Sequence, residues 1–264
     1  MERQKKNEKY VLILGGTKGI GKSIALAFTN LNKPSIIVSR SEENLKEVKN
    51  EAFKMNAENK NVYLPLDMSK IYNFPELFTE IERKNIYIDA LINNLPGGDI
   101  NNFNTFSYEE IHNCIDNKVV PYLEGIKYAK EYMYMSGGGS IVNIIGGSWK
   151  RPDSNMFVNS MINASLVNAT MNISKELAEK NININCVHPG YIFTDRYINY
   201  REKLSSKESM SIEKAHNLIC HKIPFNSIGD TNDLAQIVIL LTSENGRYIT
   251  GQNIDFDGGL SINF

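Results

Sequence analysis

Cysteine is scarce in this chain of 264 residues, which contains only Cys114, Cys186 and Cys220. The three are odd in number and far apart in the sequence. This excludes a disulfide framework of the kind that stabilises small secreted domains. We therefore expect three free thiols in a reducing compartment.

An excess of one charge and a long apolar run are also missing. The 29 Lys and Arg residues nearly balance the 30 Asp and Glu residues, so neither nucleic acid nor an anionic membrane is expected as a partner. No apolar stretch is long enough to cross a bilayer, and residues 1–10, MERQKKNEKY, lack the apolar core of a secretion signal. We expect a cytoplasmic protein that acts on a small molecule.

Short apolar runs alternate with segments of helical periodicity along the whole chain. Alternating strands and helices pair the strands in parallel and cover both faces of the sheet with helices. The pattern predicts an α/β protein, a doubly wound Rossmann fold with about seven parallel strands, as a single domain over residues 1–264. The predicted strands are 11–14, 36–39, 62–66, 90–93, 140–145, 183–187 and 253–256, and the predicted helices are about 22–31, 41–56, 74–84, 107–134, 155–180 and 230–243.

One segment, at about 194–226, departs from this alternation. It is polar and charged, has no strand signal, and lies between the sixth and seventh predicted strands. Long irregular insertions in compact domains are usually functional or mobile. We therefore predict a substrate lid there.

A glycine-rich loop follows the first predicted strand and precedes a helix. Its residues are Gly15-Gly16-Thr17-Lys18-Gly19-Ile20-Gly21. Glycines let the backbone turn sharply and approach a pyrophosphate, whose charge then faces the free N–H groups of the helix N-terminus. The loop predicts a dinucleotide site.

The end of the second strand indicates which dinucleotide is bound. Ser39 and Arg40 stand where an acidic residue would bind a free ribose 2′-hydroxyl. The guanidinium of Arg40 can bind a 2′-phosphate in forked geometry, and Lys18 adds a second positive charge. These residues favour NADP(H) over NAD(H); the alternative is that both are solvated surface cations.

Further motifs follow the glycine loop in a fixed order. They are LDMS at 66–69, NNLPG at 93–97, GSIVNI at 139–144, NCVHPGYIFT at 185–194, YITGQ at 248–252 and DGG at 257–259. From about residue 9 to 260 the chain resembles the short-chain dehydrogenase/reductase family. The resemblance implies a Rossmann fold and hydride transfer between a nicotinamide cofactor and a carbonyl or alcohol.

The resemblance also implies further cofactor contacts. The aspartate of the LDMS segment matches the family residue at the adenine, and the threonine of the PGxIxT motif matches the one beside the nicotinamide amide. We therefore expect contacts from Asp67, Met68, Asn93, Pro189, Gly190, Ile192 and Thr194.

The family's catalytic serine, tyrosine and lysine are missing at their expected positions. The segment from Glu176 to Gly190 fits the family pattern without a gap, so counting back places the YxxxK pair on Asn159 and Asn163 and the serine on Gly146. In the family the lysine lowers the pKa of the tyrosine phenol, which acts as acid or base. Amides do not ionise usefully and glycine has no hydroxyl. The chain is thus predicted to be a divergent family member.

Other residues offer substitutes. Asn117 matches a helix asparagine that anchors a proton-relay water in the family; the alternative is that it eases a helix bend. Tyr191 is the first choice for a replacement acid, against a role as a pocket wall, and Ser148 or Lys150 are further choices. His216, Cys220 and His221 are close in sequence, but too few ligands converge to predict a metal site.

Two functions remain open. One is an atypical NADP(H)-dependent oxidoreductase that reduces a conjugated alkene or an iminium, where the missing acid matters less. The other is a catalytically inactive NADP(H)-binding protein, either a cofactor-sensing regulatory partner or the inactive subunit of a mixed oligomer with an intact relative. The resemblance implies a homodimer or homotetramer through helices 107–134 and 155–180, with Met161, Val167 and Met171 as candidate contacts.

Overall fold

The computed structural model describes residues 8–98 and 101–262, and within them a single sheet of seven parallel strands organises the chain. The strand order is β3-β2-β1-β4-β5-β6-β7. This confirms the predicted doubly wound Rossmann architecture. The strands are β1 (Lys9–Leu14), β2 (Ser35–Ser39), β3 (Val62–Pro65), β4 (Tyr87–Asn93), β5 (Gly139–Ile144), β6 (Ile182–Pro189) and β7 (Asn253–Phe256).

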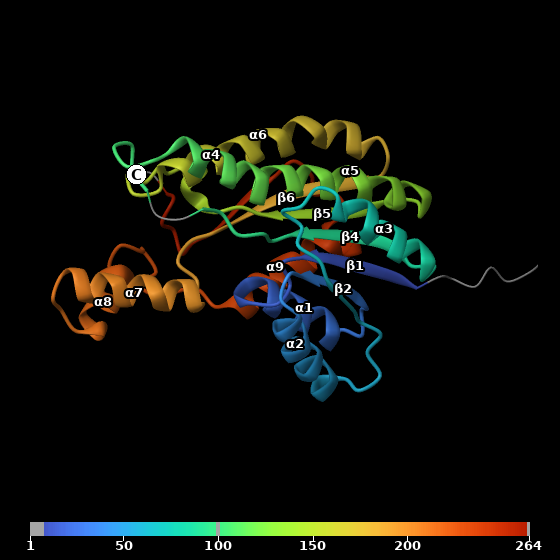
Figure 1. Cartoon of the computed structure of the whole chain (residues 1–264), viewed down its shortest axis with the longest axis horizontal. Helices are drawn as coiled ribbons and strands as arrows, with labels where there is room; N and C mark the ends of the chain where they lie inside the picture. The colour runs from blue at the N-terminus through green and yellow to red at the C-terminus, as the bar shows by residue number, and fades with distance from the viewer. Residues whose placement is uncertain (1–7, 99–100, 263–264) are drawn as a thin grey trace, which may run out of the picture.

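Helices cover both faces of the sheet, as Figure 1 shows. On one face lie α1 (Gly19–Asn30), α2 (Glu42–Met55) and α9 (Thr231–Thr242); on the other lie α3 (Asn73–Arg83), α4 (Tyr108–Cys114), α5 (Val120–Met135) and α6 (Phe157–Ala178). Each layer has its own apolar core. The central strands are apolar at consecutive positions because both of their faces are buried.

Helices α4 and α5 do not form the one continuous helix predicted over 107–134. The π-helical turn η1 (Ile115–Val119) separates them, with the N–H of Val120 donating to the carbonyl of Ile115. Pro121 stands at the start of α5 and has no N–H to continue the α-helical pattern. Single π turns inside helices are frequent at functional sites.

The predicted lid segment is helical instead of irregular. It forms α7 (Asp195–Lys207) and α8 (Ile212–Cys220), which lie together at one end of the molecule in Figure 1. The side chains of Thr194 and Ser211 cap the two helices. Both capping residues are of types that favour a helix start. The helices themselves are largely polar, so the sequence showed no clear helical periodicity of apolar residues there.

Helix α6 does not present all three predicted interface residues. Met161 and Met171 are 41% and 50% exposed, whereas Val167 is 3% exposed and packs with Tyr122 and Ile145 in an interior cluster. Val167 therefore belongs to the core, and its assignment to an interface was wrong. In the part of the chain that the structure describes, no helix is long and apolar enough to cross a membrane.

Candidate active site

The carboxyl ends of β1, β4, β5 and β6 carry the loops that form the site. The chain moves outward from β1 through β2 to β3, then returns to β4 on the other side of β1. Ligands of open α/β sheets bind at such a reversal of strand order. The glycine loop lies there, as its sequence predicted.

The glycine loop closely approaches the neighbouring strand loop. Gly15 has a φ of +85°, and the amide of Asn94 donates to its carbonyl oxygen at 3.0 Å. A Cβ on Gly21 would collide with that same carbonyl, so glycine is required. Helix α1 then begins with no acidic residue in its first turn and no side-chain cap. The N–H groups of its first turn can therefore bind a phosphate.

The predicted 2′-phosphate residues surround the ends of β1 and β2. Thr17 Oγ1 donates to Ser39 Oγ at 2.9 Å, which fixes the loop against the second strand. Arg40 and Lys18 are exposed, and neither forms an ion pair with any residue in 8–98 or 101–262. Two unpaired cations beside a hydroxyl suit an anionic phosphate.

The remaining predicted cofactor residues fall into two groups. Asp67 Oδ1 accepts hydrogen bonds from the N–H and the hydroxyl of Ser69, and Met68 beside it is buried. Asn93 corrects the prediction, because its side chain is fully buried and donates to Asn143 Oδ1 at 2.8 Å. That amide joins β4 to β5 inside the core and is not available to a cofactor.

The loop after β6 returns to the glycine loop. Pro189 ends β6, the Gly190 N–H donates to the carbonyl of Phe256, and Ile192 is 5% exposed. Thr194 lies next to the glycine loop: its Cγ2 is 3.1 Å from where a Cβ on Gly19 would stand. Residues predicted to contact the two ends of the cofactor are thus brought to one edge of the sheet.

Asn159 and Asn163 are both 3% exposed and hold loops in place. Asn159 Nδ2 donates to the carbonyl of Gly98 at 2.8 Å. Asn163 Nδ2 donates to the carbonyl of Gly146 at 3.2 Å and to Ser148 Oγ at 3.0 Å. The positions predicted for the missing lysine and serine therefore meet, joined by the Asn163 amide.

Lys118 completes this cluster, and the sequence interpretation missed it. Its side chain enters from the π turn, is only 5% exposed, and donates from Nζ to Asn163 Oδ1 at 2.8 Å. It also lies 5.8 Å from the ring centroid of Tyr122. Burial, and secondarily the charge of Arg196, lowers the pKa of Lys118 from 10.5 to about 8.

Asn117, the neighbour of Lys118, faces outward. Its Nδ2 donates to the carbonyl of Asn113 at 2.6 Å, and the residue is exposed. This contact corresponds to the helix-bend alternative. The side chains of Asn117 and Lys118 thus point in different directions from the π turn. Pro121 was the local sequence signal from which this turn could have been predicted.

Tyr191 lies toward the lid helices. Its ring stacks on Tyr200 of α7, with centroids 5.8 Å apart. Burial, followed by the proximity of Tyr200, raises the pKa of the Tyr191 phenol, which makes it a weaker acid than a free phenol. Lys150 pairs with Asp255 at 3.2 Å. Neither residue has the contact with Asn163 that Lys118 makes.

His188 and the lid histidine have partners of their own. His188 bonds the carbonyl of Ile145 and the side chain of Asn253, and burial lowers its pKa, so it is a neutral histidine in the core. His216 bonds Tyr197 and Cys220 within the lid. Among the described residues, no three His, Cys, Asp or Glu side chains are grouped so as to hold a metal ion.

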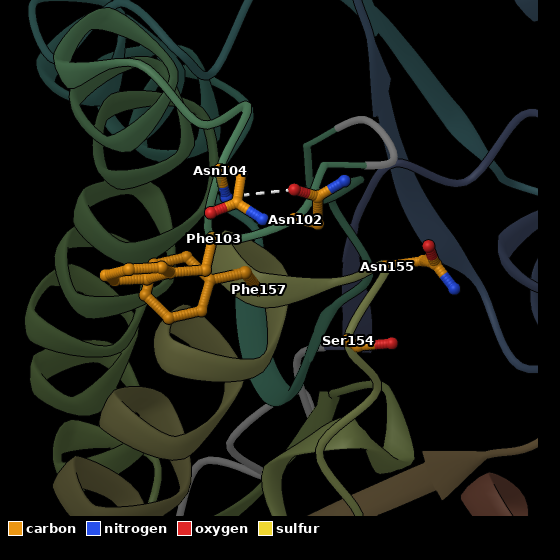
Figure 2. Close-up of a pocket in the computed structure, with 6 residues that line it drawn as sticks. All are labelled: Asn102, Phe103, Asn104, Ser154, Asn155 and Phe157. Atoms are coloured by element: carbon orange, nitrogen blue, oxygen red, sulfur yellow. Dashed lines mark hydrogen bonds between the residues drawn. The ribbon is translucent and has the colours of Figure 1, made fainter.

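A shallow hollow of about 350 Å³ lies where the loop after β4 meets the start of α6. Figure 2 shows its lining, in which Phe103 and Phe157 contact each other edge to face while Asn102, Ser154 and Asn155 carry the polar groups. The N–H of Asn104 donates to Asn102 Oδ1 at 2.9 Å. The hollow is an uncharged surface at the start of α6, lined by two aromatic and four polar residues.

A parallel sheet with a glycine loop at its switch point is the arrangement of the Rossmann nucleotide-binding class. The family model for enoyl-(acyl carrier protein) reductase matches residues 15–261. The NADPH-dependent reductase BacG of Bacillus subtilis (strain 168) is 38% identical over 253 residues, covering 96% of this chain and 98% of the relative. The chain therefore belongs to the short-chain dehydrogenase/reductase family, as its motifs indicated.

Two solved structures extend this comparison. YwfH, an NADPH-dependent reductase involved in bacilysin biosynthesis, has a TM-score of 0.91 and 37% identity, covering 96% of this chain and 98% of that chain. ElxO, solved with NADP bound, has a TM-score of 0.84 and 26% identity, covering 96% of this chain and 98% of that chain.

Proposed function

We propose that this protein is an NADPH-dependent reductase of a small organic substrate. The predicted cofactor agrees with the relatives, since BacG is an NADPH-dependent reductase and ElxO binds NADP. The residues of this chain fit that cofactor: the first turn of α1 carries no acid, and Arg40 and Lys18 are unpaired among the described residues. When bound, NADPH supplies the hydride.

The contact between Lys118 and Asn163 carries the proposal of an atypical mechanism. Asn159 and Asn163 occupy the positions of the family's tyrosine and lysine, and the Nζ of Lys118 reaches Asn163 from another helix. A buried ammonium without a carboxylate partner is costly, and ionisable groups perturbed in this way cluster at functional sites. We assign Lys118 as the group that meets the carbonyl group of the substrate in place of the missing tyrosine and lysine.

The neighbouring residues position Lys118. The amide of Asn163 cannot turn freely, because its Nδ2 donates to both Gly146 and Ser148 while its Oδ1 accepts from Lys118. Gly97 leaves the space above them, since a Cβ there would collide with Asn159 and stand 3.8 Å from Lys118 Cδ. This ordered cluster favours an enzyme over the inactive-subunit alternative.

Replacement of Lys118 tests the proposal. NADPH oxidation by Lys118→Met with a panel of conjugated aldehydes and ketones should be lost, while NADPH binding measured by nucleotide fluorescence should persist. Full activity of Lys118→Met would refute the assignment. Absence of activity in the wild-type protein with every substrate, together with normal NADPH binding, would favour the inactive-subunit alternative.

We further propose a cytoplasmic homodimer or homotetramer, with the α7–α8 segment as its substrate lid. Met161 and Met171 are exposed on α6, and Phe103 and Tyr108 are exposed at the start of α4. Apolar side chains gathered on neighbouring helices suit a two-fold contact. Light scattering at micromolar concentration tests this, and a mass above the expected multiples would indicate a mixed assembly with an intact relative.

A further inference from the structure

Lys118 differs from the paired lysines of this protein in the chemistry of its partner. Lys22, Lys33 and Lys150 each pair with a carboxylate. In the described part of the chain Lys118 meets no carboxylate, and its one hydrogen-bond acceptor is the neutral amide of Asn163. A neutral acceptor serves a free amine as well as an ammonium.

The surroundings of Lys118 favour the free amine. Burial is the main cause of its lowered pKa, the charge of Arg196 on α7 acts in the same direction, and Cys114 on α4 opposes them. Tyr122 on α5 offers a ring face, and His188 on β6 is held neutral. With a pKa of about 8, roughly half of the Lys118 side chains are free amines at pH 8, against less than about 1% of ordinary lysines.

The hydrogen bonds of Asn163 orient this amine. Because Asn163 Nδ2 donates to Gly146 and Ser148, its Oδ1 faces Lys118 and accepts one N–H. The lone pair of the amine is then left for another atom. A desolvated lysine beside a second cation is a recurrent device for making an amine nucleophilic.

We propose that Lys118 is a covalent nucleophile that forms an iminium with the carbonyl group of the substrate. This rests on the proposed reductase function and goes beyond it. The lone pair of Nζ attacks the carbonyl carbon and a C–N bond forms. The carbonyl oxygen takes one proton from the nitrogen and one from solvent and leaves as water, so the nitrogen becomes a cationic iminium.

The iminium defines the class of substrate. Hydride addition at the carbon bonded to nitrogen would leave the product attached to Lys118 as a secondary amine. Hydride addition at a conjugated carbon instead sends the electron pair to the nitrogen, giving an enamine. Protonation at the α-carbon regenerates an iminium, water breaks its C–N bond, and the saturated carbonyl compound leaves. The substrate is therefore a small α,β-unsaturated aldehyde or ketone.

Covalent bonding also accounts for the missing tyrosine. A phenol is needed in the family to protonate the oxygen that receives the electron pair of the carbonyl. In an iminium the positively charged nitrogen receives that pair, and no proton is required at the moment of hydride addition. Asparagine at positions 159 and 163 is then compatible with turnover, because Asn159 holds the loop at Gly98 and Asn163 holds the amine.

Reductive trapping tests the proposal on the whole chain without nucleotide. The protein is incubated with trans-cinnamaldehyde and sodium cyanoborohydride at pH 8, then digested and examined by mass spectrometry. Lys118 should carry the reduced adduct at a rate at least about tenfold above exposed lysines such as Lys127, given its larger fraction of free amine. Asn163→Leu, which retains the lysine but removes the oxygen that orients it, should reduce labelling of Lys118 several-fold.

Lys118→Arg separates this proposal from the reductase function. Arginine keeps the charge and the N–H donors but is not a nucleophile. Loss of both the adduct and cinnamaldehyde reduction in Lys118→Arg, with NADPH binding retained, supports the covalent role. If Lys118→Arg reduces cinnamaldehyde without forming an adduct, the covalent role is overturned and the reductase function is left intact. Labelling of wild-type Lys118 no faster than that of Lys127 has the same consequence. A specific adduct without any reduction of cinnamaldehyde or related enones would support the nucleophile but refute the reductase.

Discussion

The two sides of the site are built in different ways. The cofactor side uses neighbouring residues, because Thr17 and Lys18 share one loop and Ser39 and Arg40 end the adjacent strand. The proposed catalytic side joins Lys118 from the π turn, Asn163 from α6 and Ser148 from the turn η2 (Gly147–Trp149). The first side is specified by local sequence and the second by tertiary packing.

This difference shows which parts of a site a family resemblance can predict. Local motifs keep the backbone geometry that binds a nucleotide, and those residues stayed at their positions. A catalytic group needs only to place an atom in a given volume, so another helix can supply it. The loss of a family residue on the proposed catalytic side is therefore weak evidence that the protein is inactive. Loss of the glycine loop would be stronger evidence.

The largest expected effect is on the catalytic side. Lys118→Met should lower kcat/KM for conjugated carbonyl substrates by about 10²–10⁴-fold, the range that acid–base or comparable catalysis contributes. NADPH affinity, measured by fluorescence, should change little, because the cofactor side is separate. Lys127→Met on the exposed surface of α5 is the matched control and should retain activity. A similar loss in both variants would contradict the assignment.

The same substitution should stabilise the protein at neutral pH. Unfolded Lys118 binds its proton with a pKa of 10.5 and folded Lys118 with a pKa of about 8. At pH 7 the buried charge therefore costs up to about 3 kcal/mol, which methionine removes. The unfolded state binds more protons between these pKa values, so the wild type gains stability as the pH rises from 8 to 10.5.

Chemical denaturation at several pH values measures this effect. The free energy of unfolding of Lys118→Met should exceed that of the wild type at pH 7, and the gap should narrow by pH 10. A constant gap would contradict the lowered pKa of Lys118. Lys127→Met, at an exposed lysine of the neighbouring helix, again serves as the control.

A smaller effect is expected on the cofactor side. Arg40→Asp should weaken NADPH binding by at least about tenfold, since a charge-assisted hydrogen bond contributes roughly 1.5–3 kcal/mol. NADH, which has no 2′-phosphate, should lose much less. Nucleotide fluorescence titration compares the two. Equal losses would mean that Arg40 is only a surface cation.

The smallest effect concerns the π turn that separates the two neighbours. Asn117→Ala removes the 2.6 Å hydrogen bond to the carbonyl of Asn113, worth about 0.5–1.5 kcal/mol. We expect a modest fall in thermal stability and a fall in kcat of a few-fold, with NADPH binding unchanged. Loss of activity as large as that of Lys118→Met would restore Asn117 to a direct role in proton relay.

Much of the fold could be predicted from the sequence, because the strands are buried on both faces and read as short apolar runs. The glycine loop could be predicted equally well, because its functional residues are consecutive in the sequence. The position of Lys118 could not be predicted. Helical periodicity does not indicate which of two adjacent residues points into the core when a π turn interrupts the helix. Val167 and Asn93 were misassigned for a related reason: a motif gives a position, while packing decides which way the side chain faces.

The π turn at Ile115–Val119 also sets how the side chains of the next helix are oriented. A π turn holds one residue more than an α-helical turn, so it is the smallest change in length that a helix can accept. Such a change rotates every following side chain while the ends of the helix keep their contacts. Such a turn can direct one side chain inward, as it does for Lys118, while the strands of the sheet keep their places.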